Sequence, residues 1–419
     1  MRASLKHLVG HSSVFVLSVF LAILPVRSAE AGAPENRAEV EVGRLVVVGD
    51  SLSAGFQNFS LYDSDSDSVA PPGGQTHGFA ALIAHQADVS LKLPLIQYPG
   101  IPPVLTLEGK NSVTRGTTLG TREPQTLPIQ TLNLSVPGFT VADSLVRSVN
   151  VAKLEKNPKL ANVEDLLTVE VLGFPSLEKR SSPCGVLPLP NGDVLFSAAA
   201  CAFQLRPTTI LVSIGNDDVL QTLTSGVPPT SLHSFSQAYA LLLETLSQSH
   251  GRIVVSNIFD VTAVPFLLSV RDFELRCGFA PSGAGPTDYV VPNIADPTAT
   301  SFNVCTDYAV RSASLIAQAR TAVRDYNLII AATAAKFGAV VVDVNKLFAQ
   351  IAKHGYNVAG HHLTTQYLGG IFSLDAIHPT NTGYAILANA FIDRMNCELH
   401  TDIPPVNIEE VAESDPLVF

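Results

Sequence analysis

The stretch LVVVGDSLSAG at residues 45–55 decides how the rest of the chain can be interpreted. Its first four residues are apolar, which is typical of a buried strand in a parallel sheet. Ser51 follows this strand within a turn of small residues. Because open α/β sheets bind ligands at the carboxyl ends of their strands, Ser51 is a candidate nucleophile. The alternative is that Ser51 only caps the helix that follows.

Strand-like and helix-like segments alternate along the rest of the chain. Strands are expected at 129–136, 208–214, 252–259 and 340–344, and the segment 91–96 is compatible with another. Helical apolar spacing occurs at 78–87, 141–149, 234–248, 312–337, 347–354 and 383–395. This alternation predicts parallel β-α units, and therefore a doubly wound α/β domain of about five strands with helices on both faces.

The excess length of the chain lies in loop-rich segments, so we expect one elaborated domain. This domain is expected to span 32–399, with insertions near 56–127, 155–205 and 265–308. Residues 400–419 are expected to form an acidic, loosely held C-terminal tail.

Residues 1–31 have the organisation of a cleavable signal peptide. Arg2 and Lys6 precede an apolar run at 14–24, which is too short to span a bilayer comfortably. The sequence AEA at 29–31 has the form of a cleavage site. We therefore expect a secreted or periplasmic protein without a stable membrane anchor. A buried N-terminal helix is the alternative.

Export makes disulfides possible for the five cysteines. Two pairs each lie within one loop-rich region, so we expect disulfides between Cys184 and Cys201 and between Cys277 and Cys305. Cys397 would then be free. The cysteines and histidines do not have the spacing of a zinc site, so we expect no metal.

The composition indicates a globular protein with a sizeable core, because 46% of the residues are hydrophobic and 15% are charged. The formal net charge of −11 argues against binding to nucleic acid or to an anionic membrane through a basic surface.

A nucleophilic serine needs a base, a carboxylate that orients the base, and donors for the oxyanion. His378 lies in LDAIHP at 374–379, and Asp375 precedes it by three residues. In a tight turn this spacing brings a carboxylate to imidazole Nδ1 and leaves Nε2 free for Ser51. The alternative is a surface histidine near an incidental aspartate. Candidate oxyanion donors are the backbone N–H groups of Ser51 and Gly138, together with a side-chain amide after the 208–214 strand.

Four blocks, GDSLSAG at 49–55, NLSVPG at 133–138, IGNDD at 214–218 and DAIHP at 375–379, resemble the GDSL or SGNH hydrolases. These are esterases and lipases on a flavodoxin-like sheet, and GFQNFS at 55–60 is similar to bacterial lipase or acylhydrolase members. The resemblance implies that Ser51 is the nucleophile, His378 the general base and then acid, and Asp375 the residue that orients it. It also implies that Ser51 and Gly138 are backbone oxyanion donors, and that no cofactor is needed.

The third block departs from the family pattern Gly-x-Asn-Asp, whose asparagine is an oxyanion donor. Here the residues are Gly215-Asn216-Asp217-Asp218, so Asp217 occupies the asparagine position if the glycine sets the register. An ionised carboxylate accepts hydrogen bonds only and would repel an oxyanion. Either Asn216 serves as the donor, or Asp217 is protonated, or this donor is missing.

These observations predict an exported serine ester hydrolase of the lipase or acylhydrolase type, which cleaves carboxylic esters through an acyl-enzyme. The substrate would be a small-molecule or lipid ester. One alternative is a catalytically weakened member that binds a lipid or a glycan. Another is a carbohydrate O-acetylesterase, which would use the same three residues.

Overall fold

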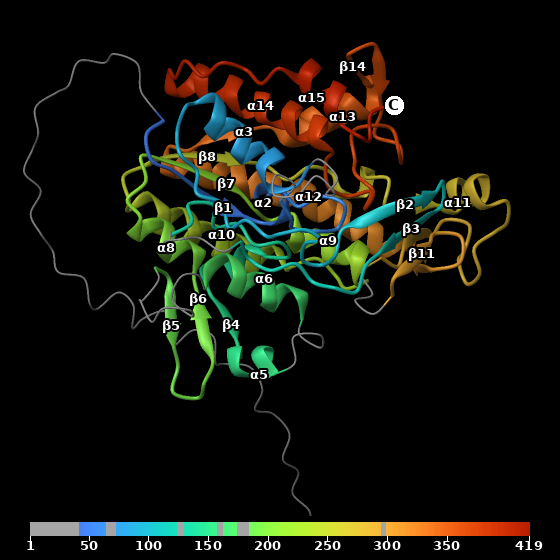
Figure 1. Ribbon diagram of the computed structural model, residues 1–419, viewed down its shortest axis with the longest axis horizontal. Coiled ribbons are helices and arrows are strands. Elements are labelled where there is room, and N and C mark those ends of the chain that lie inside the picture. The colour runs from blue at the N-terminus through green and yellow to red at the C-terminus, as the bar shows by residue number, and fades with distance from the viewer. Residues whose placement is uncertain (1–41, 64–72, 124–129, 157–161, 174–183, 295–298) are drawn as a thin grey trace, which may run out of the picture. The chain divides into compact units, whose positions relative to one another are not determined.

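The computed structural model describes residues 42–63, 73–123, 130–156, 162–173, 184–294 and 299–419 (Figure 1). The expected signal peptide lies outside these ranges. Within them, no helix combines the length and the apolar character needed to cross a membrane.

The centre of the fold is a parallel sheet with the strand order β1-β7-β8-β13. Its strands are β1 (Leu45–Gly49), β7 (Thr209–Ser213), β8 (Arg252–Ser256) and β13 (Val340–Val342). Every residue of β1 and β7 is buried, as the apolar runs predict for strands covered on both faces. The α/β class expected from the alternating pattern is confirmed.

The segment expected as a strand at 129–136 lies beside β1 but is not a regular strand. Val47 N–H donates to Leu132 O at 2.9 Å, and Leu134 N–H donates to Val47 O at 2.9 Å. The pairing is an isolated parallel bridge between Asn133 and Val47, and the Asn133 side chain also donates from Nδ2 to Ser53 O at 2.8 Å. With this segment as an irregular edge, the strands follow the order 2-1-3-4-5 of flavodoxin-like sheets.

The prediction of a possible strand at 91–96 is wrong. Pro94 has no N–H to donate, and Ile96 makes only an isolated bridge, to Arg122.

Helices cover both faces of the sheet (Figure 1). One face carries α3 (Phe79–Gln86), α13 (Val344–His354) and α14 (Asn381–Leu399). The other carries α8 (Ala198–Gln204), α10 (Leu232–Ser247) and α12 (Ala313–Phe337). Aromatic side chains join neighbouring helices within each layer: Phe79 stacks on Phe391 at 4.7 Å, and Phe235 stacks on Tyr326 at 3.9 Å. The predicted helix at 141–149 ends early, as α4 (Val141–Leu145), and continues into a strand.

Each insertion contributes to a small antiparallel sheet. The sheets are β4-β6-β5, β12-β10-β9 and β11-β3-β2. Their strands are β2 (Leu105–Gly109), β3 (Ser112–Arg115), β4 (Arg147–Val149), β5 (Val186–Pro188), β6 (Val194–Phe196), β9 (Leu268–Ser269), β10 (Tyr289–Pro292), β11 (Ser301–Asn303) and β12 (Tyr308–Arg311). The first and third insertions share one sheet, because β3 pairs with β11.

The remaining elements are short. Helices are α2 (Ser51–Ala54), α5 (Val151–Lys156), α6 (Val163–Leu172), α9 (Asp217–Thr224), α11 (Val270–Cys277) and α15 (Ile408–Ser414). A hairpin is formed by β14 (Tyr356–Val358) and β15 (His361–Leu363).

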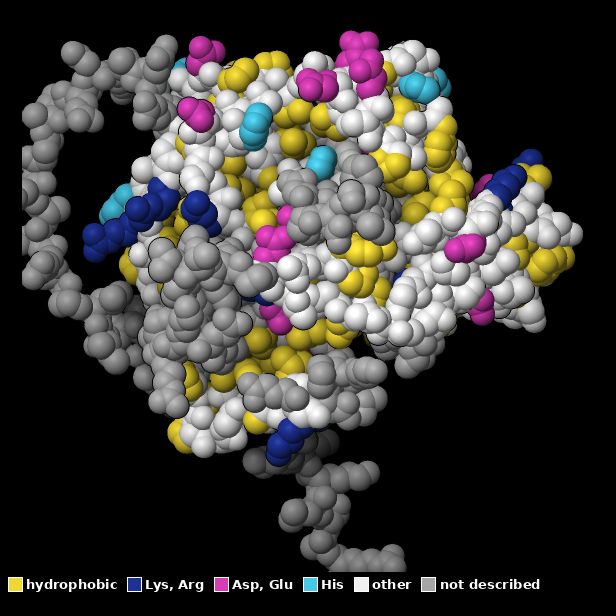
Figure 2. Space-filling model, in the orientation of Figure 1, with side chains coloured by type: hydrophobic (Ala, Val, Ile, Leu, Met, Phe, Trp, Pro, Cys, Tyr) yellow, Lys and Arg dark blue, Asp and Glu magenta, His cyan; other side chains and the backbone are white. Residues whose placement is uncertain are grey.

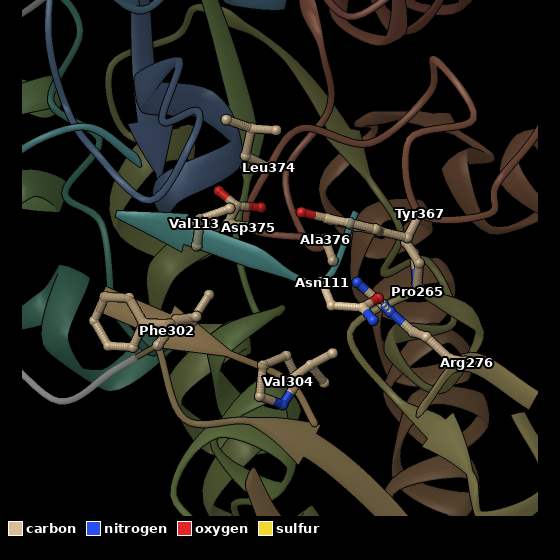
Figure 3. Close-up of a pocket in the computed structure, with 12 residues that line it drawn as sticks. Asn111, Val113, Pro265, Arg276, Phe302, Val304, Tyr367, Leu374, Asp375 and Ala376 are labelled. Atoms are coloured by element: carbon tan, nitrogen blue, oxygen red, sulfur yellow. Dashed lines mark hydrogen bonds between the residues drawn. The ribbon is translucent and has the colours of Figure 1, made fainter. Parts of the chain in front are cut away.

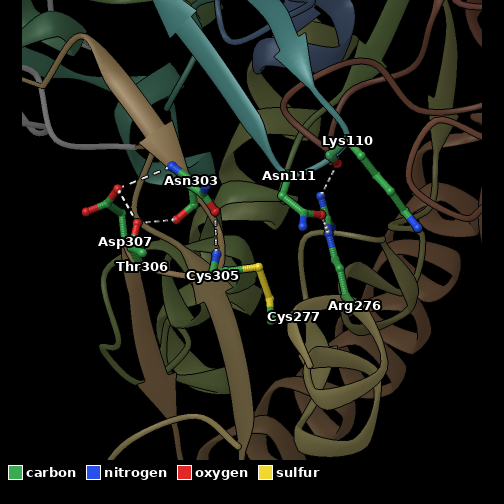
Figure 4. Close-up of a disulfide and its surroundings, with 8 residues drawn as sticks. All are labelled: Lys110, Asn111, Arg276, Cys277, Asn303, Cys305, Thr306 and Asp307. Carbon is green, nitrogen blue, oxygen red and sulfur yellow. Dashed lines mark hydrogen bonds between the residues drawn. A yellow bond between two sulfur atoms is a disulfide. The ribbon is translucent and has the colours of Figure 1, made fainter. Parts of the chain in front are cut away.

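Both predicted disulfides are present, one between Cys184 and Cys201 and one between Cys277 and Cys305. The second ties the end of α11 to the loop after β11 (Figure 4). Cys397 is free and exposed, as expected.

The expectation of a loosely held C-terminal tail is wrong. Asp415 is buried, and its Oδ2 accepts hydrogen bonds from Thr382 N and Thr382 Oγ1, both at 2.8 Å. The segment also buries Ile403, Val406 and Ala412. These contacts hold the last residues against the start of α14.

Candidate active site

Ser51 is the first residue of α2 and lies just past the carboxyl end of β1. Asp50 caps this short helix, because its Oδ1 accepts a hydrogen bond from Leu52 N at 3.1 Å. Gly49 is required where strand and helix meet, since a Cβ there would lie 2.3 Å from both Ser213 O and Ser53 Oγ. Asp50 therefore takes the capping role that was the alternative for Ser51.

His378 and Asp375 lie in a tight turn directly before α14. Ser373 N–H donates to His378 O at 2.7 Å, and Ala376 has a positive φ of 62°. His378 Nδ1 lies 2.9 Å from Asp375 Oδ2, and His378 Nε2 lies 2.8 Å from Ser51 Oγ. The structure thus brings together the three residues that the sequence had singled out.

Four hydrogen bonds saturate the Asp375 carboxylate. Oδ1 accepts from the backbone N–H groups of Ile377 and His378, both at 2.8 Å. Oδ2 accepts from Phe59 N–H at 2.7 Å and faces His378 Nδ1. Burial by itself raises the pKa of Asp375, but the adjacent imidazole and these donors outweigh it and hold the pKa below its ordinary value.

The backbone N–H groups of Ser51 and Gly138 are the candidates for binding an oxyanion. Within the described ranges, neither Ser51 N–H nor Gly138 N–H donates a hydrogen bond. Gly138 adopts a φ of 91°, which favours glycine, and a Cβ there would lie 3.1 Å from Glu164 Cγ.

The side chains of Asn216 and Asp217 have different surroundings. Asn216 N–H and Nδ2 both donate to Asp50 Oδ2, at 3.3 and 3.0 Å. Asp217 Oδ2 is buried and has no hydrogen-bond partner among the described residues. Burial, reinforced by Asp50 and by Glu164, raises the pKa of Asp217 well above its ordinary value. The Asn216 amide is thus engaged with the carboxylate that precedes Ser51.

Further acidic groups surround this region. Burial raises the pKa of Asp50 to about 6 and that of Glu164 to about 7. Arg147 forms ion pairs with Asp143, Glu164 and Asp165 at 3.2, 2.6 and 2.8 Å. On the face shown in Figure 2, Lys and Arg side chains lie mostly towards the edges, and acidic side chains lie both along the upper edge and near the middle.

A small cavity lies beside Asp375 (Figure 3). Its volume is about 30 Å³, and its lining includes Arg276 and Tyr367. Arg276 Nε donates to Asn111 Oδ1 at 2.9 Å, and its guanidinium lies 4.4 Å from the Tyr367 ring centroid. A volume of this size has room for about two water molecules.

Sequence reasoning missed two contributors to the site. Phe59 lies in the GFQNFS segment, whose family resemblance does not mark a role for it, and the one usable sign is its closeness to Ser51 in the chain. Glu164 comes from an insertion, and no pattern in the sequence marks it.

A family model described as GDSL-like Lipase/Acylhydrolase matches residues 45–391. No curated protein matches the chain. Among solved structures, an alpha/beta hydrolase enzyme from the metagenome of Lake Arreo, Spain, is 12% identical, with a TM-score of 0.38, over 86% of this chain and 97% of that one. An acetylxylan esterase from Geobacillus stearothermophilus is 13% identical, with a TM-score of 0.36, over 85% and 96%. Because both TM-scores lie below 0.5, these two likenesses support no conclusion about substrate.

Proposed function

Because the chain belongs to the GDSL-like lipase/acylhydrolase family, we propose that it is a serine hydrolase that cleaves carboxylic esters through an acyl-enzyme. The observation that carries this proposal is the unbroken contact from Ser51 Oγ through His378 to Asp375, at 2.8 and 2.9 Å. The family supports ester hydrolysis in general, and the geometry supports the assignment of roles to residues.

In the proposed reaction, His378 Nε2 takes the Ser51 proton while Oγ attacks the ester carbonyl. Asp375 keeps a hydrogen on Nδ1 and stabilises the imidazolium that forms. His378 then gives the proton to the leaving alcohol, which departs from the tetrahedral intermediate. Water, deprotonated by the same nitrogen, attacks the acyl-enzyme and releases the acid. Every proton that His378 takes is returned within the cycle, so no other acid or base is required.

The oxyanion would be stabilised by the N–H groups of Ser51 and Gly138, with Asn216 or Asp217 as the third group. Neither of these N–H groups donates a hydrogen bond in the part of the chain that the structure describes, which supports the first part. For the third group, one hydrogen of the Asn216 amide is already engaged with Asp50, so only its second hydrogen could serve. A protonated Asp217 is the other possible donor. Loss of such a donor costs roughly 3–4 kcal/mol of transition-state stabilisation.

We further propose that the protein is exported and acts on small-molecule or lipid esters. The two disulfides are consistent with an extracellular or periplasmic location, because such bonds persist in oxidising compartments. The proposed signal peptide, 1–31, would direct this export.

A second candidate function is a weakened family member that binds a lipid or a glycan and turns over slowly. The carboxyl of Asp217 at the position of a family donor favours this alternative. The two functions differ in turnover and not in fold, so activity measurements separate them.

The test is hydrolysis of p-nitrophenyl acetate, butyrate and palmitate and of an acetylated xylooligosaccharide, with Ser51→Ala beside wild type. Ser53→Ala is the matched control, since Ser53 lies in the same helix and its hydroxyl only donates to Ser213 O at 3.0 Å. We expect turnover by wild type and Ser53→Ala, none by Ser51→Ala, and a fluorophosphonate adduct on Ser51. Equal inertness of wild type and Ser51→Ala towards every ester would contradict hydrolysis and favour the binding function. Preference for the acetylated sugar over the acyl esters would indicate an O-acetylesterase.

A further inference from the structure

Four consecutive residues, 56–59, contact the segment that carries Asp375 and His378, through one ring contact and several hydrogen bonds. We call them the support loop. The Phe56 ring meets the His378 ring edge-on, with centroids 4.9 Å apart, and Gln57 Nε2 donates to Asn381 Oδ1 at 3.0 Å. The last two residues of the loop, Asn58 and Phe59, bond three successive residues of the turn before His378.

The three bonds run in register along the turn. Asn58 N–H donates to Ser373 Oγ at 3.0 Å, and Leu374 N–H donates to Asn58 Oδ1 at 3.0 Å. Phe59 N–H then donates to Asp375 Oδ2 at 2.7 Å. Asn58 therefore forms hydrogen bonds with Ser373 and Leu374, the two residues before Asp375. Phe59, the next residue, donates to the carboxylate oxygen that faces His378 Nδ1.

The conformation of the support loop explains why an asparagine stands at its centre. Asn58 and Phe59 have positive φ values of 51° and 56°. Asparagine tolerates this left-handed region better than most residues, whereas phenylalanine does not prefer it. Asn58 is buried, with 6% of its surface exposed, so an unpaired Oδ1 or Leu374 N–H would be costly. The Asn58 side chain thus holds the backbone in the one arrangement that aims Phe59 N–H at Asp375.

We propose that Asn58 is a positioning residue, which sets the place of the Asp375 carboxylate, and through it that of the imidazole, by bonding Ser373 and Leu374. This inference rests on the proposed hydrolase function. Asn58 does not touch the reacting atoms itself. Its effect is on alignment, and small misplacements of catalytic groups are expensive in rate.

The variant that tests this is Asn58→Gly, which tolerates the left-handed backbone but removes the acceptor for Leu374 N–H. Competent sites are counted by titration with a fluorophosphonate, so that kcat is expressed per active site. We expect kcat and kcat/KM for p-nitrophenyl butyrate to fall together by about 10- to 100-fold, with KM unchanged. A merely structural role would lower the number of titrated sites and leave kcat per site intact.

Asn389→Ala is the matched control, because the Asn389 side chain also exchanges two hydrogen bonds with a backbone, that of Val406, and neither residue belongs to the turn that holds Asp375. It should keep the wild-type kcat per site. Ser373→Ala removes the acceptor of Asn58 N–H and provides a second test if Asn58→Gly does not fold. The two changes should also be non-additive when combined, since they act on one alignment.

The inference is overturned if Asn58→Gly or Ser373→Ala keeps a kcat per site within twofold of wild type, or if Asn389→Ala loses as much. Wild type that is inert towards every ester would instead overturn the hydrolase function, so the two failures are distinguishable.

Discussion

Replacing Asp375 by asparagine should remove most of the activity, by a route that its hydrogen bonds predict. Each carboxylate oxygen accepts two hydrogen bonds. Oδ1 accepts from the backbone N–H groups of Ile377 and His378, and Oδ2 accepts from the backbone N–H of Phe59 and from the imidazole Nδ1–H. In asparagine one of these two places is taken by an NH2 group, which donates and does not accept.

The two orientations of the asparagine amide differ in cost. With the NH2 in the Oδ1 place, two backbone N–H groups lose their acceptor, and each buried orphan costs about 1–3 kcal/mol. With the NH2 in the Oδ2 place, only Phe59 N–H is orphaned, because the imidazole can change tautomer and accept at Nδ1. The second orientation leaves one buried N–H group fewer without an acceptor, and it is therefore favoured by about 1–3 kcal/mol. It leaves a hydrogen on His378 Nε2, which can then no longer take the Ser51 proton.

We expect Asp375→Asn to lower kcat/KM for p-nitrophenyl butyrate on the order of 10⁴-fold, with the folded state retained. Circular dichroism checks the fold, and Asp402→Asn, at an exposed aspartate, is the control for the same chemical change. A loss smaller than about tenfold would refute the reasoning, since it would mean that the catalytic tautomer survives without the carboxylate.

Three further predictions concern groups around the site and at the end of the chain. Asp217→Asn should raise kcat by about 10-fold or more, increasingly at higher pH because an amide does not ionise, and an unchanged pH–rate profile would contradict an oxyanion role for this position. Burial raises the pKa of Asp218 to about 7, so the folded state binds this proton more tightly than the unfolded state, and its contribution to the free energy of unfolding falls as pH rises from about 4 to about 7. In urea titrations, Asp218→Asn should reduce the decrease in the free energy of unfolding between pH 4 and pH 7 by about 4 kcal/mol at most. The same pH dependence of the free energy of unfolding in both proteins would contradict this prediction. Asp415→Ala should lower the free energy of unfolding by about 1–3 kcal/mol, because Thr382 N–H loses its buried acceptor, and equal urea midpoints would argue against a packed C-terminus.

The expected contacts that the structure contains are those encoded locally. Asp375 and His378 are three residues apart, and one tight turn is enough to bring them into contact. Ser51 follows an apolar run whose burial in a parallel sheet places it at the sheet's carboxyl edge. The disulfides were predictable for the same reason, since each joins cysteines within one loop-rich region.

What could not be predicted depends on contacts between distant segments or on single side chains. Asn58 and Ser373 are 315 residues apart in the sequence, and a left-handed asparagine leaves no periodic pattern. The segment 132–136 has a strand-like sequence, but it pairs with β1 as an isolated bridge and not as a regular strand. The end of the chain is acidic in composition, yet one of its acids, Asp415, is the acceptor that secures it.

The shared sheet β11-β3-β2 has a consequence for how this chain can be altered. Its strands come from two insertions that lie far apart in the sequence. Within the second of these insertions, the Cys277–Cys305 disulfide joins the end of α11 to the loop after β11. Deleting either insertion alone would leave the other with an unpaired strand edge. Such an edge can form backbone hydrogen bonds with another molecule and promote aggregation. For anyone shortening, grafting or randomising these loops, the two insertions are a single module and have to be exchanged together.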